Sequence, residues 1–364
     1  MIQHRLFVIL AACFFTINIS AQYNFSKVDD WLNKNTGEMG GRSYLMIYKD
    51  GKIIYSNGVE NMSLSQKWVA KKFAQKQNKD PEIKPYTDTT RIAMASCSKW
   101  FSAALVMTFV DEGKLNLSDT IGKFLPVLSA NGKGNITISE CLSHLTGIKA
   151  PPLKENLKDM RSENSMDEVI ENIAKMPMEG TPETVFHYSN VGLQIAGAVI
   201  EKISGESFET LFTERIAKPL NMPNTDFGNA KVPLPAGGAY STPEDYMHFL
   251  EMILNKGIYN GKRILSEKSI EEMQLNRINK NTKISYSPAE AGNFGYGFGE
   301  WIMETSANNI TTTVTSPGLF GTFPWVDNKN NYCAFLMTFY LKNTGRNERY
   351  KTLKSLVDEI INNH

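Results

Sequence analysis

The chain has 364 residues, and its 39 Lys and Arg against 38 Asp and Glu leave a formal net charge of +1. Hydrophobic residues make up 41% of it and charged residues 21%, values typical of a soluble folded protein and not of a disordered chain. The balanced charge argues against a nucleic-acid partner, since such proteins usually carry a strong basic excess. This length provides one large domain or two closely packed ones, with enough core for an enzyme.

The first residues are typical of an export signal. Arg5 precedes an apolar run at residues 6–17 that is too short to span a bilayer comfortably, and small residues follow it. We expect cleavage after Ala21, which leaves a mature chain of residues 22–364 in the periplasm or outside the cell. Cys13 lies in a sequence that resembles a bacterial lipoprotein box, so a lipid anchor is the alternative. No later segment is long and apolar enough to predict a membrane span.

The N-terminal part of the mature chain predicts a helix followed by a hairpin. Residues 24–34 have the apolar spacing of an amphipathic helix. Residues 43–49 and 52–58 have strand patterns and flank Asp50-Gly51, the strongest two-residue signal for a type I′ hairpin. Residues 63–84 are rich in lysine, which favours a solvated helical insertion over a contact with an anionic surface.

From Ser96 the pattern becomes helical, and helices or loops predominate up to about residue 244. Strand patterns return after residue 294, and a final amphipathic helix is expected over residues 346–363. The predicted strands of this part cover residues 294–303, 309–315, 319–327 and 331–340. Strands at both chain ends with helices between them predict a mixed α/β (α+β) fold. We expect one antiparallel sheet built from residues 22–100 and 245–364, flanked by helices, with an all-helical subdomain inserted at about 101–244.

The sharpest local feature is Ser96-Cys97-Ser98-Lys99, where an extended segment meets the long apolar helix. If Ser96 begins that helix, Lys99 lies one turn further on the same face, with Cβ atoms about 5–6 Å apart. A helix N-terminus suits an attacking alkoxide because it offers backbone N–H groups and a positive partial charge. An ammonium cannot accept a proton, so either burial lowers the pKa of Lys99 or a second residue is the base. By itself, the pattern is equally compatible with a helix-capping Ser96 and a solvated Lys99.

A second candidate is Tyr188-Ser189-Asn190, which ends an apolar stretch and precedes a helix. A phenol becomes a usable base only beside a cation, so Tyr188 next to Lys99 would form a self-consistent group with Ser96. Asn190 could donate to a substrate carbonyl and bridge to Lys99. The same three letters occur at Tyr55, but that tyrosine lies in the first hairpin with no helix after it, so we expect Tyr55 to be remote from the site.

These residues together resemble the serine β-lactamase-related, penicillin-recognising hydrolases, and most of all their class C β-lactamase-like branch. That branch includes D-alanyl-D-alanine carboxypeptidases, D-aminopeptidases and esterases. The resemblance runs from about Ser43 to Tyr340 and includes the segments DTTRIAMAS, DEGKLNLSDTIGKFLP, ITISECLSHLTGI and AGGAYSTPEDYMHFL. It implies a β-lactamase/transpeptidase-like fold and acyl transfer without a cofactor. Ser96 would be the nucleophile, and Lys99 and Tyr188 would share the acid and base work.

The third motif of that family is altered in this chain. The family usually has Lys or His, a small residue and Gly, whereas the matching stretch here is Ser316-Pro317-Gly318. Leu319 would supply the second oxyanion N–H, beside that of Ser96. Ser316 can form hydrogen bonds but has no charge with which to attract a substrate carboxylate. A neutral ester or amide, small molecule or peptide, is therefore the expected substrate. The alternatives are a true β-lactamase or D-Ala-D-Ala peptidase, and a catalytically silent binding or sensor domain on the same fold.

The remaining cysteines and histidines are expected to have structural roles. Three cysteines remain after the export signal. This odd number allows at most one disulfide and favours buried thiols. These are Cys97, Cys141 and Cys333. His144 and His187 have no evident paired acid, and the family base is a tyrosine. Histidines and cysteines show no metal-binding spacing, so no metal site is predicted.

Overall fold

The computed structural model describes residues 23–364 except 77, 79 and 153–162. The predicted export signal and Cys13 lie outside the described residues. Within the described part, no helix has the length and apolar character needed to cross a membrane.

A seven-stranded antiparallel sheet forms the centre of the molecule, with the strand order β2-β1-β13-β12-β11-β10-β9. The N-terminal strand β1 pairs directly with the C-terminal strand β13, with Leu45 opposite Leu336. Both chain ends therefore contribute to one sheet, and the predicted fold class is confirmed. The strands are β1 (Arg42–Lys49), β2 (Lys52–Glu60), β9 (Gly295–Tyr296), β10 (Trp301–Thr305), β11 (Thr311–Thr315), β12 (Phe323–Asp327) and β13 (Tyr332–Thr338).

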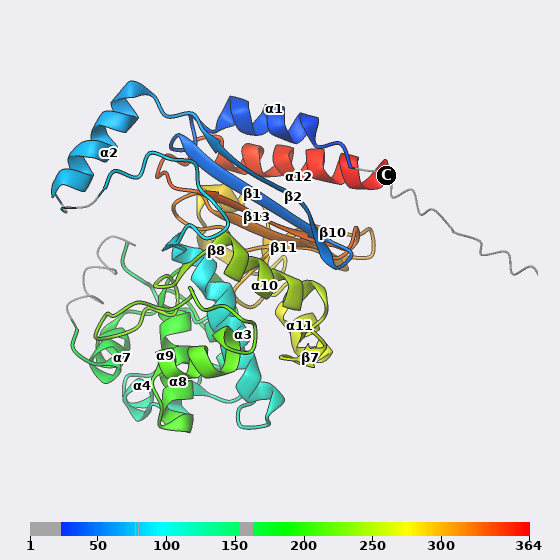
Figure 1. Cartoon of the computed structure of the whole chain (residues 1–364). Helices are drawn as coiled ribbons and strands as arrows, with labels where there is room; N and C mark the ends of the chain where they lie inside the picture. Colours follow the sequence, from blue (N-terminus) through cyan, green and yellow to red (C-terminus); the bar gives the residue numbers. More distant parts are fainter. Residues whose placement is uncertain (1–22, 77, 79, 153–162) are drawn as a thin grey trace, which may run out of the picture.

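Helices cover both faces of this sheet, so its central strands are apolar on both sides (Figure 1). Helices α1 (Ser26–Asn35) and α12 (Arg346–Asn362) lie on one face. Along β1, Leu45 and Ile47 belong to the core under these two helices, whereas Tyr44 and Met46 belong to the core on the other face. This alternation follows from the two-residue period of a strand.

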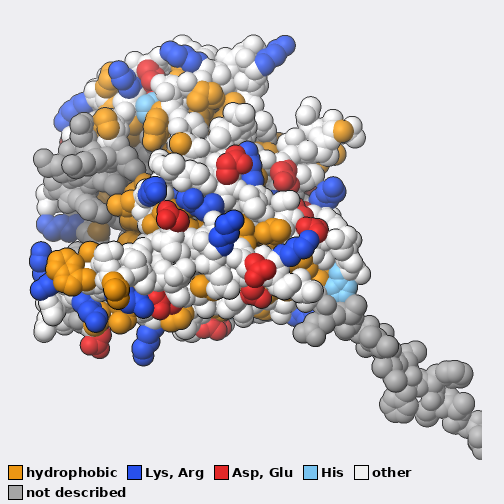
Figure 2. Space-filling view, turned by 90° about the horizontal axis from the view of Figure 1, so that it is seen from above, with side chains coloured by type: hydrophobic (Ala, Val, Ile, Leu, Met, Phe, Trp, Pro, Cys, Tyr) orange, Lys and Arg blue, Asp and Glu red, His pale blue; other side chains and the backbone are white. Residues whose placement is uncertain are grey.

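The predicted hairpin and the lysine-rich helix are both confirmed. Asp50 and Gly51 have φ angles of 48° and 83°, the left-handed values that a type I′ turn requires. Helix α2 (Leu64–Lys76) projects from the sheet, and its Trp68 is 62% exposed. Seen from above, Lys and Arg side chains are interspersed with Asp and Glu over the surface, in agreement with the near-zero net charge (Figure 2).

The helical layer is organised around α3 (Ser98–Asp111), which is buried along most of its length because it is apolar on all sides. Helix α10 (Pro243–Leu254) packs between α3 and the sheet, and Phe249 of α10 contacts Phe101 of α3. The other helices are α4 (Pro126–Ala130), α5 (Ile138–Leu142), α7 (Met166–Lys175), α8 (Val191–Ser204), α9 (Phe208–Phe212) and α11 (Glu267–Met273). The boundaries of about 101 and 244 for a helical subdomain stay a prediction.

The described residues also form three small two-stranded sheets, and two of them lie next to the site. They are β3 (Ile92–Ala93) with β5 (Tyr240–Ser241), β4 (Val185–His187) with β8 (Lys283–Tyr286), and β6 (Ile258–Tyr259) with β7 (Lys262–Arg263). The first precedes Ser96 in the chain, and the second leads into Tyr188. Each places its following residues at the junction between the large sheet and the helical layer.

Candidate active site

Ser96 lies in a 3₁₀ turn, η1 (Ala95–Cys97), that continues directly into α3. The turn makes Cys97 the N-cap residue, so Ser96 does not cap the helix. Ala95 has a φ of 48°, a left-handed backbone that is strained for a residue with a Cβ. The surrounding structure holds this conformation, since Met94 N donates to Ala239 O at 2.8 Å. The serine side chain is thereby presented at the end of α3 by a fixed backbone.

Lys99 is buried one turn after Ser96, with an exposed fraction of 1%. Its Nζ lies 3.3 Å from Ser96 Oγ, 3.4 Å from Asn190 Oδ1 and 2.7 Å from the carbonyl oxygen of Ala236. Burial lowers the pKa of Lys99 to about 7. A neutral amine has two N–H groups for the two carbonyl oxygens and one lone pair. That lone pair can accept a hydrogen bond from the Ser96 hydroxyl.

Tyr188 lies beside the same serine, and its hydroxyl is hydrogen-bonded to Ser96. Its ring packs against His144 and Trp301, with ring centroids 4.7 and 5.1 Å away. Lys99 Nζ lies over the face of the ring, 4.7 Å from its centroid. Burial raises the pKa of Tyr188 above its usual range, so the phenol keeps its proton near neutral pH. A phenol in this state can donate a proton, whereas the phenolate base expected from the sequence stays a prediction.

Ser316, directly after β11, turns its hydroxyl toward the protein interior. Its Oγ donates to Gly299 O at 2.9 Å and lies 3.4 Å from Ser96 O. Ser316 is 2% exposed and is not among the residues that line the two cavities described below. The structure therefore brings Ser316 next to the nucleophile turn, but behind it.

Gly318 and Leu319 lie closer to the reacting side. A Cβ on Gly318 would approach Met94 O to 2.6 Å, so only glycine permits this contact with the nucleophile segment. Gly318 N donates to Thr322 O. The N–H groups of Leu319 and Ser96 donate to no other backbone group among the described residues. They remain available as the predicted pair of oxyanion donors.

Two cavities meet at Ser96. The tyrosine cavity, of about 520 Å³, includes Lys99, Tyr188, Tyr286 and Trp301 in its lining. The loop cavity, of about 610 Å³, is lined mainly by residues 227–240 together with Phe320 and Phe339. Ser96, Asn190 and Leu319 line both cavities. The candidate nucleophile thus stands at the junction of a two-part cleft.

Several polar residues of the tyrosine cavity have no signal in the sequence pattern. Arg346 and Glu290 both line it and form an ion pair with 3.4 Å between Nη1 and Oε1. The same Arg346 nitrogen donates to Leu319 O at 3.0 Å. His187 also lines this cavity, and its Nδ1 is hydrogen-bonded to Glu179, so it has the paired acid that the sequence did not reveal. The two members of each pair come from separate elements, so no local spacing links them.

The remaining candidates line neither cavity, although the His144 ring packs against that of Tyr188. His144 is buried, its Nε2 lies 3.0 Å from Tyr296 Oη, and burial holds its pKa well below the usual range. Tyr55 donates to Asp29 of α1 in the core under α1 and α12, remote from Ser96 as expected. The three described cysteines are buried free thiols, in agreement with their predicted packing role.

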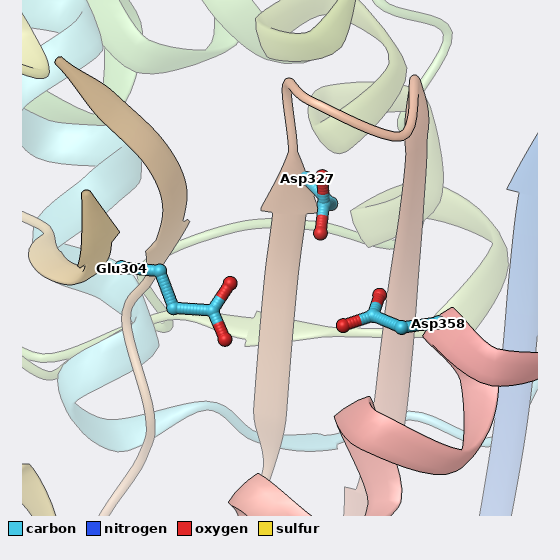
Figure 3. A group of neighbouring side chains, drawn as sticks. All are labelled: Glu304, Asp327 and Asp358. Atoms are coloured by element: carbon cyan, nitrogen blue, oxygen red, sulfur yellow. The ribbon is translucent and has the colours of Figure 1, made fainter. Parts of the chain in front are cut away.

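Outside the cleft, the described residues include one cluster of acids with the spacing of a metal site: Glu304, Asp327 and Asp358 (Figure 3). The ammonium of Lys354 lies among these carboxylates, at 2.8, 2.8 and 2.7 Å from their oxygens. It supplies the positive charge that the acids require, and together they raise the pKa of Lys354 despite its burial. The cluster is therefore an ion-pair network that joins α12 to the sheet, with Lys354 and Asp327 buried and Glu304 at its exposed edge.

The chain is similar to known proteins in sequence and in fold. A profile of the family described as Beta-lactamase matches residues 39–358. Protein flp of Staphylococcus aureus (strain MW2) is 27% identical over 194 residues, which are 52% of this chain and 35% of that protein. The chain thus spans well under half the length of that curated relative.

Solved structures share the fold over nearly the whole chain. A protein of Bacteroides dorei DSM 17855, described provisionally as a beta-lactamase, is 24% identical with a TM-score of 0.76, and the match covers 93% of this chain and 99% of that one. EstCE1, a hydrolase with promiscuous acyltransferase activity, is 19% identical with a TM-score of 0.71 over 92% of this chain and 98% of its own.

Proposed function

The chain belongs to the beta-lactamase family, and from that premise we propose that it is a serine hydrolase that cleaves a neutral ester or amide. The reaction proceeds through an acyl-enzyme on Ser96. The observation that carries this proposal is the position of Lys99 Nζ, which lies 3.3 Å from Ser96 Oγ and within hydrogen-bond distance of two carbonyl oxygens. In the neutral amine, two N–H groups can serve these oxygens, and the lone pair can then accept the Ser96 proton. A pKa of about 7 makes this amine a working base near neutral pH.

In the first half of the reaction, the Lys99 lone pair takes the Ser96 proton while Oγ attacks the substrate carbonyl carbon. The oxyanion accepts hydrogen bonds from the N–H groups of Ser96 and Leu319. Tyr188 donates its proton to the departing oxygen or nitrogen and is reprotonated from the Lys99 ammonium. The bond to the leaving group breaks, and the acyl group stays on Ser96. Asn190, which touches Lys99 and lines both cavities, orients the amine and the substrate.

In the second half, a water molecule attacks the acyl-enzyme carbonyl. Lys99 takes a proton from this water, and the proton returns to Ser96 Oγ as the ester bond breaks. No charged group outside the protein is needed in either half. Over the two halves, the protons that leave Ser96, Tyr188 and water end on a product or return to these residues.

The preference for a neutral substrate rests on the third motif. A cation in the place of Ser316 would attract a substrate carboxylate, but this hydroxyl is donated to the carbonyl oxygen of Gly299. The buried Arg346 lies in the tyrosine cavity, but its charge is already paired with Glu290. A β-lactam is the second candidate, since members of this family are known by that activity.

The test is covalent labelling with a fluorophosphonate together with hydrolysis of p-nitrophenyl acetate and nitrocefin. Wild type should gain one covalent label and hydrolyse the acetate, whereas Ser96→Ala should do neither. Ser65→Ala, an exposed serine of α2, is the matched control and should behave as wild type. Faster turnover of nitrocefin than of the ester would favour the β-lactamase alternative. Absence of both label and turnover above Ser96→Ala would overturn the hydrolase and favour the silent binding domain.

Export is also part of the proposal and rests on the sequence of residues 1–21. The mature protein should begin at Gln22, which mass spectrometry of its N-terminal peptide would reveal. A lipid-modified terminus at Cys13 would support the lipoprotein alternative instead. An unprocessed Met1 in the cell-associated protein would contradict both.

A further inference from the structure

We propose that the loop cavity binds the acyl part of the substrate, and that this acyl part is an uncharged hydrocarbon chain. The inference rests on the proposed hydrolase function and adds a substrate class to it. Three observations carry it: the position of the proton donor, the chemistry of the cavity lining, and the way the cavity walls are held.

The position of the proton donor indicates which cavity takes the leaving group and which takes the acyl group. Ser96 and Leu319, which would hold the reacting carbonyl, line both of them. Tyr188 and Lys99 line the tyrosine cavity and are not part of the loop cavity lining. The leaving group must accept a proton from these residues as its bond breaks, so it lies on their side. The acyl group, on the other side of the carbonyl carbon, then extends into the loop cavity.

The lining of the loop cavity is largely apolar. Its hydrocarbon and aromatic surface comes from Phe227, Val232, Pro233, Leu234, Tyr240 and Phe320. Two charged residues, Glu163 and Lys231, also belong to the lining, and their charges are opposite. Lys231 Nζ donates to Asn164 Oδ1 at 2.8 Å. Transfer of an alkyl chain from water to this surface is favourable, whereas a charged acyl chain would lose hydration over most of it.

The walls of the loop cavity are held in place without a ligand. Ser102 Oγ donates to Pro235 O at 2.6 Å, and Ala239 N donates to Ser98 Oγ at 3.0 Å, so α3 anchors both ends of the segment 235–239. Phe227 packs against Phe212 of α9 with 4.9 Å between ring centroids. A preformed cavity binds a chain with little ordering cost.

Aromatic side chains form part of the exposed lining of this cavity. Phe320 stacks on Phe339, with ring centroids 4.4 Å apart, and Phe339 is 46% exposed. Tyr240 lies at the same lining and is 42% exposed. A chain longer than the cavity would therefore continue over aromatic surface before it reaches water.

The experiment measures kcat/KM for p-nitrophenyl acetate, butyrate, hexanoate and octanoate, below their aggregation limits. The leaving group is the same throughout, so differences report the acyl side. Each methylene that enters the cavity can raise kcat/KM by up to about fourfold, and we expect the hexanoate to exceed the acetate by at least about tenfold.

Two matched variants test the location. Ala230 and Ala289 are both exposed alanines, but Ala230 lines the loop cavity and Ala289 lines the tyrosine cavity. Ala230→Trp should lower the ratio of hexanoate to acetate kcat/KM at least about fivefold, because the indole occupies space needed by the chain. Ala289→Trp should change that ratio less than Ala230→Trp and should instead change the ratio between p-nitrophenyl and ethyl esters of the same acid. Thermal unfolding of each variant checks that it is folded.

A hexanoate-to-acetate ratio of one or less in wild type would overturn the inference. So would equal effects of Ala230→Trp and Ala289→Trp on that ratio. Ser96-dependent hydrolysis in either case would leave the proposed hydrolase function standing. If no ester is hydrolysed above the Ser96→Ala background, the hydrolase proposal fails and this inference fails with it.

Discussion

Replacement of Lys99 by methionine should remove activity and at the same time stabilise the protein. The folded pKa of Lys99 is about 7, against 10.5 for the ordinary side chain. At 1.36 kcal/mol per unit, this difference corresponds to a destabilisation of about 5 kcal/mol at and below pH 7. The Lys99 side chain is fully buried, so solvent screening does not reduce this energy much. Methionine has nearly the same length and no charge to desolvate.

The gain is partly offset by hydrogen bonds that methionine cannot make. The carbonyl oxygen of Ala236 and Oδ1 of Asn190 would lose their donor, at a cost of about 1–3 kcal/mol each. With these two losses at about 2 kcal/mol each, we expect Lys99→Met to be more stable than wild type by about 1 kcal/mol at pH 6. Its kcat/KM should fall by about 10²–10⁴-fold because the base for Ser96 is gone.

The pH dependence of the difference is the sharper part of the prediction. Between pH 7 and 10.5 the unfolded chain holds a proton on Lys99 that the folded chain has lost, so the stability of wild type rises with pH by about 1.4 kcal/mol per unit. The advantage of Lys99→Met is therefore greatest below pH 7 and shrinks as the pH rises toward 10.5. The contributions of other titrating groups to the free energy of unfolding cancel when the two proteins are compared at the same pH.

Urea unfolding at pH 6, 7, 8 and 9 measures this difference directly. Ser96→Ala is the matched control, because it also removes activity but keeps the lysine, and it should retain the wild-type pH slope. A difference between Lys99→Met and wild type that does not change from pH 6 to 9 would refute a neutralised Lys99, and with it the assignment of this amine as the base.

Three further predictions concern the same site and its support. In wild type, log kcat/KM should rise by about one per pH unit below pH 7 and level off above it, since the base acts when deprotonated; a flat profile from pH 5 to 8 contradicts this. Gly318→Ala should lower kcat/KM by about tenfold or more, because its Cβ would meet Met94 O at 2.6 Å and displace Leu319, and an unchanged kcat/KM would show that this contact is not needed. Lys354→Met should lower the free energy of unfolding by about 3–5 kcal/mol, because it leaves the buried Asp327 without a cation. Lys202→Met, which removes an exposed ion pair with Asp167, should change it by less than about 1 kcal/mol. Equal losses in the two variants would contradict a stabilising role of the Lys354–Asp327 pair.

The local part of the candidate site could be predicted because it depends on short spacings. Ser96 and Lys99 are three residues apart at a strand-to-helix junction, and their side chains do lie within 3.3 Å. Tyr188 could be chosen over Tyr55 because a helix follows it, and the structure places it beside Ser96. The proposed roles of these residues await the tests above.

The rest of the cleft had no such signal. Arg346 meets Glu290 from 56 residues away in the sequence, and the loop cavity combines Glu163 with residues near 230, 320 and 339. Ser316 lies next to the nucleophile turn, but the direction of its hydroxyl depends on Gly299, which belongs to another loop, and its substrate-binding role stays a prediction. Such contacts are set by packing between layers, which no single segment encodes.

Periodicity and turn chemistry in the sequence were enough to determine the strands at both chain ends and the apolar helix between them. These features depend on backbone geometry over a few neighbouring residues, so they can be read locally. The net charge of +1 agrees with the face shown in Figure 2, where positive and negative side chains are interspersed, but it gives no information about the site. Only the tertiary structure places Ser96 between two cavities and buries Lys99 and Tyr188, which lowers the pKa of Lys99 to about 7 and raises that of Tyr188. Protonation and cavity shape depend on which distant segments exclude water from a side chain, and for Lys99 those are the residues around 190 and 236.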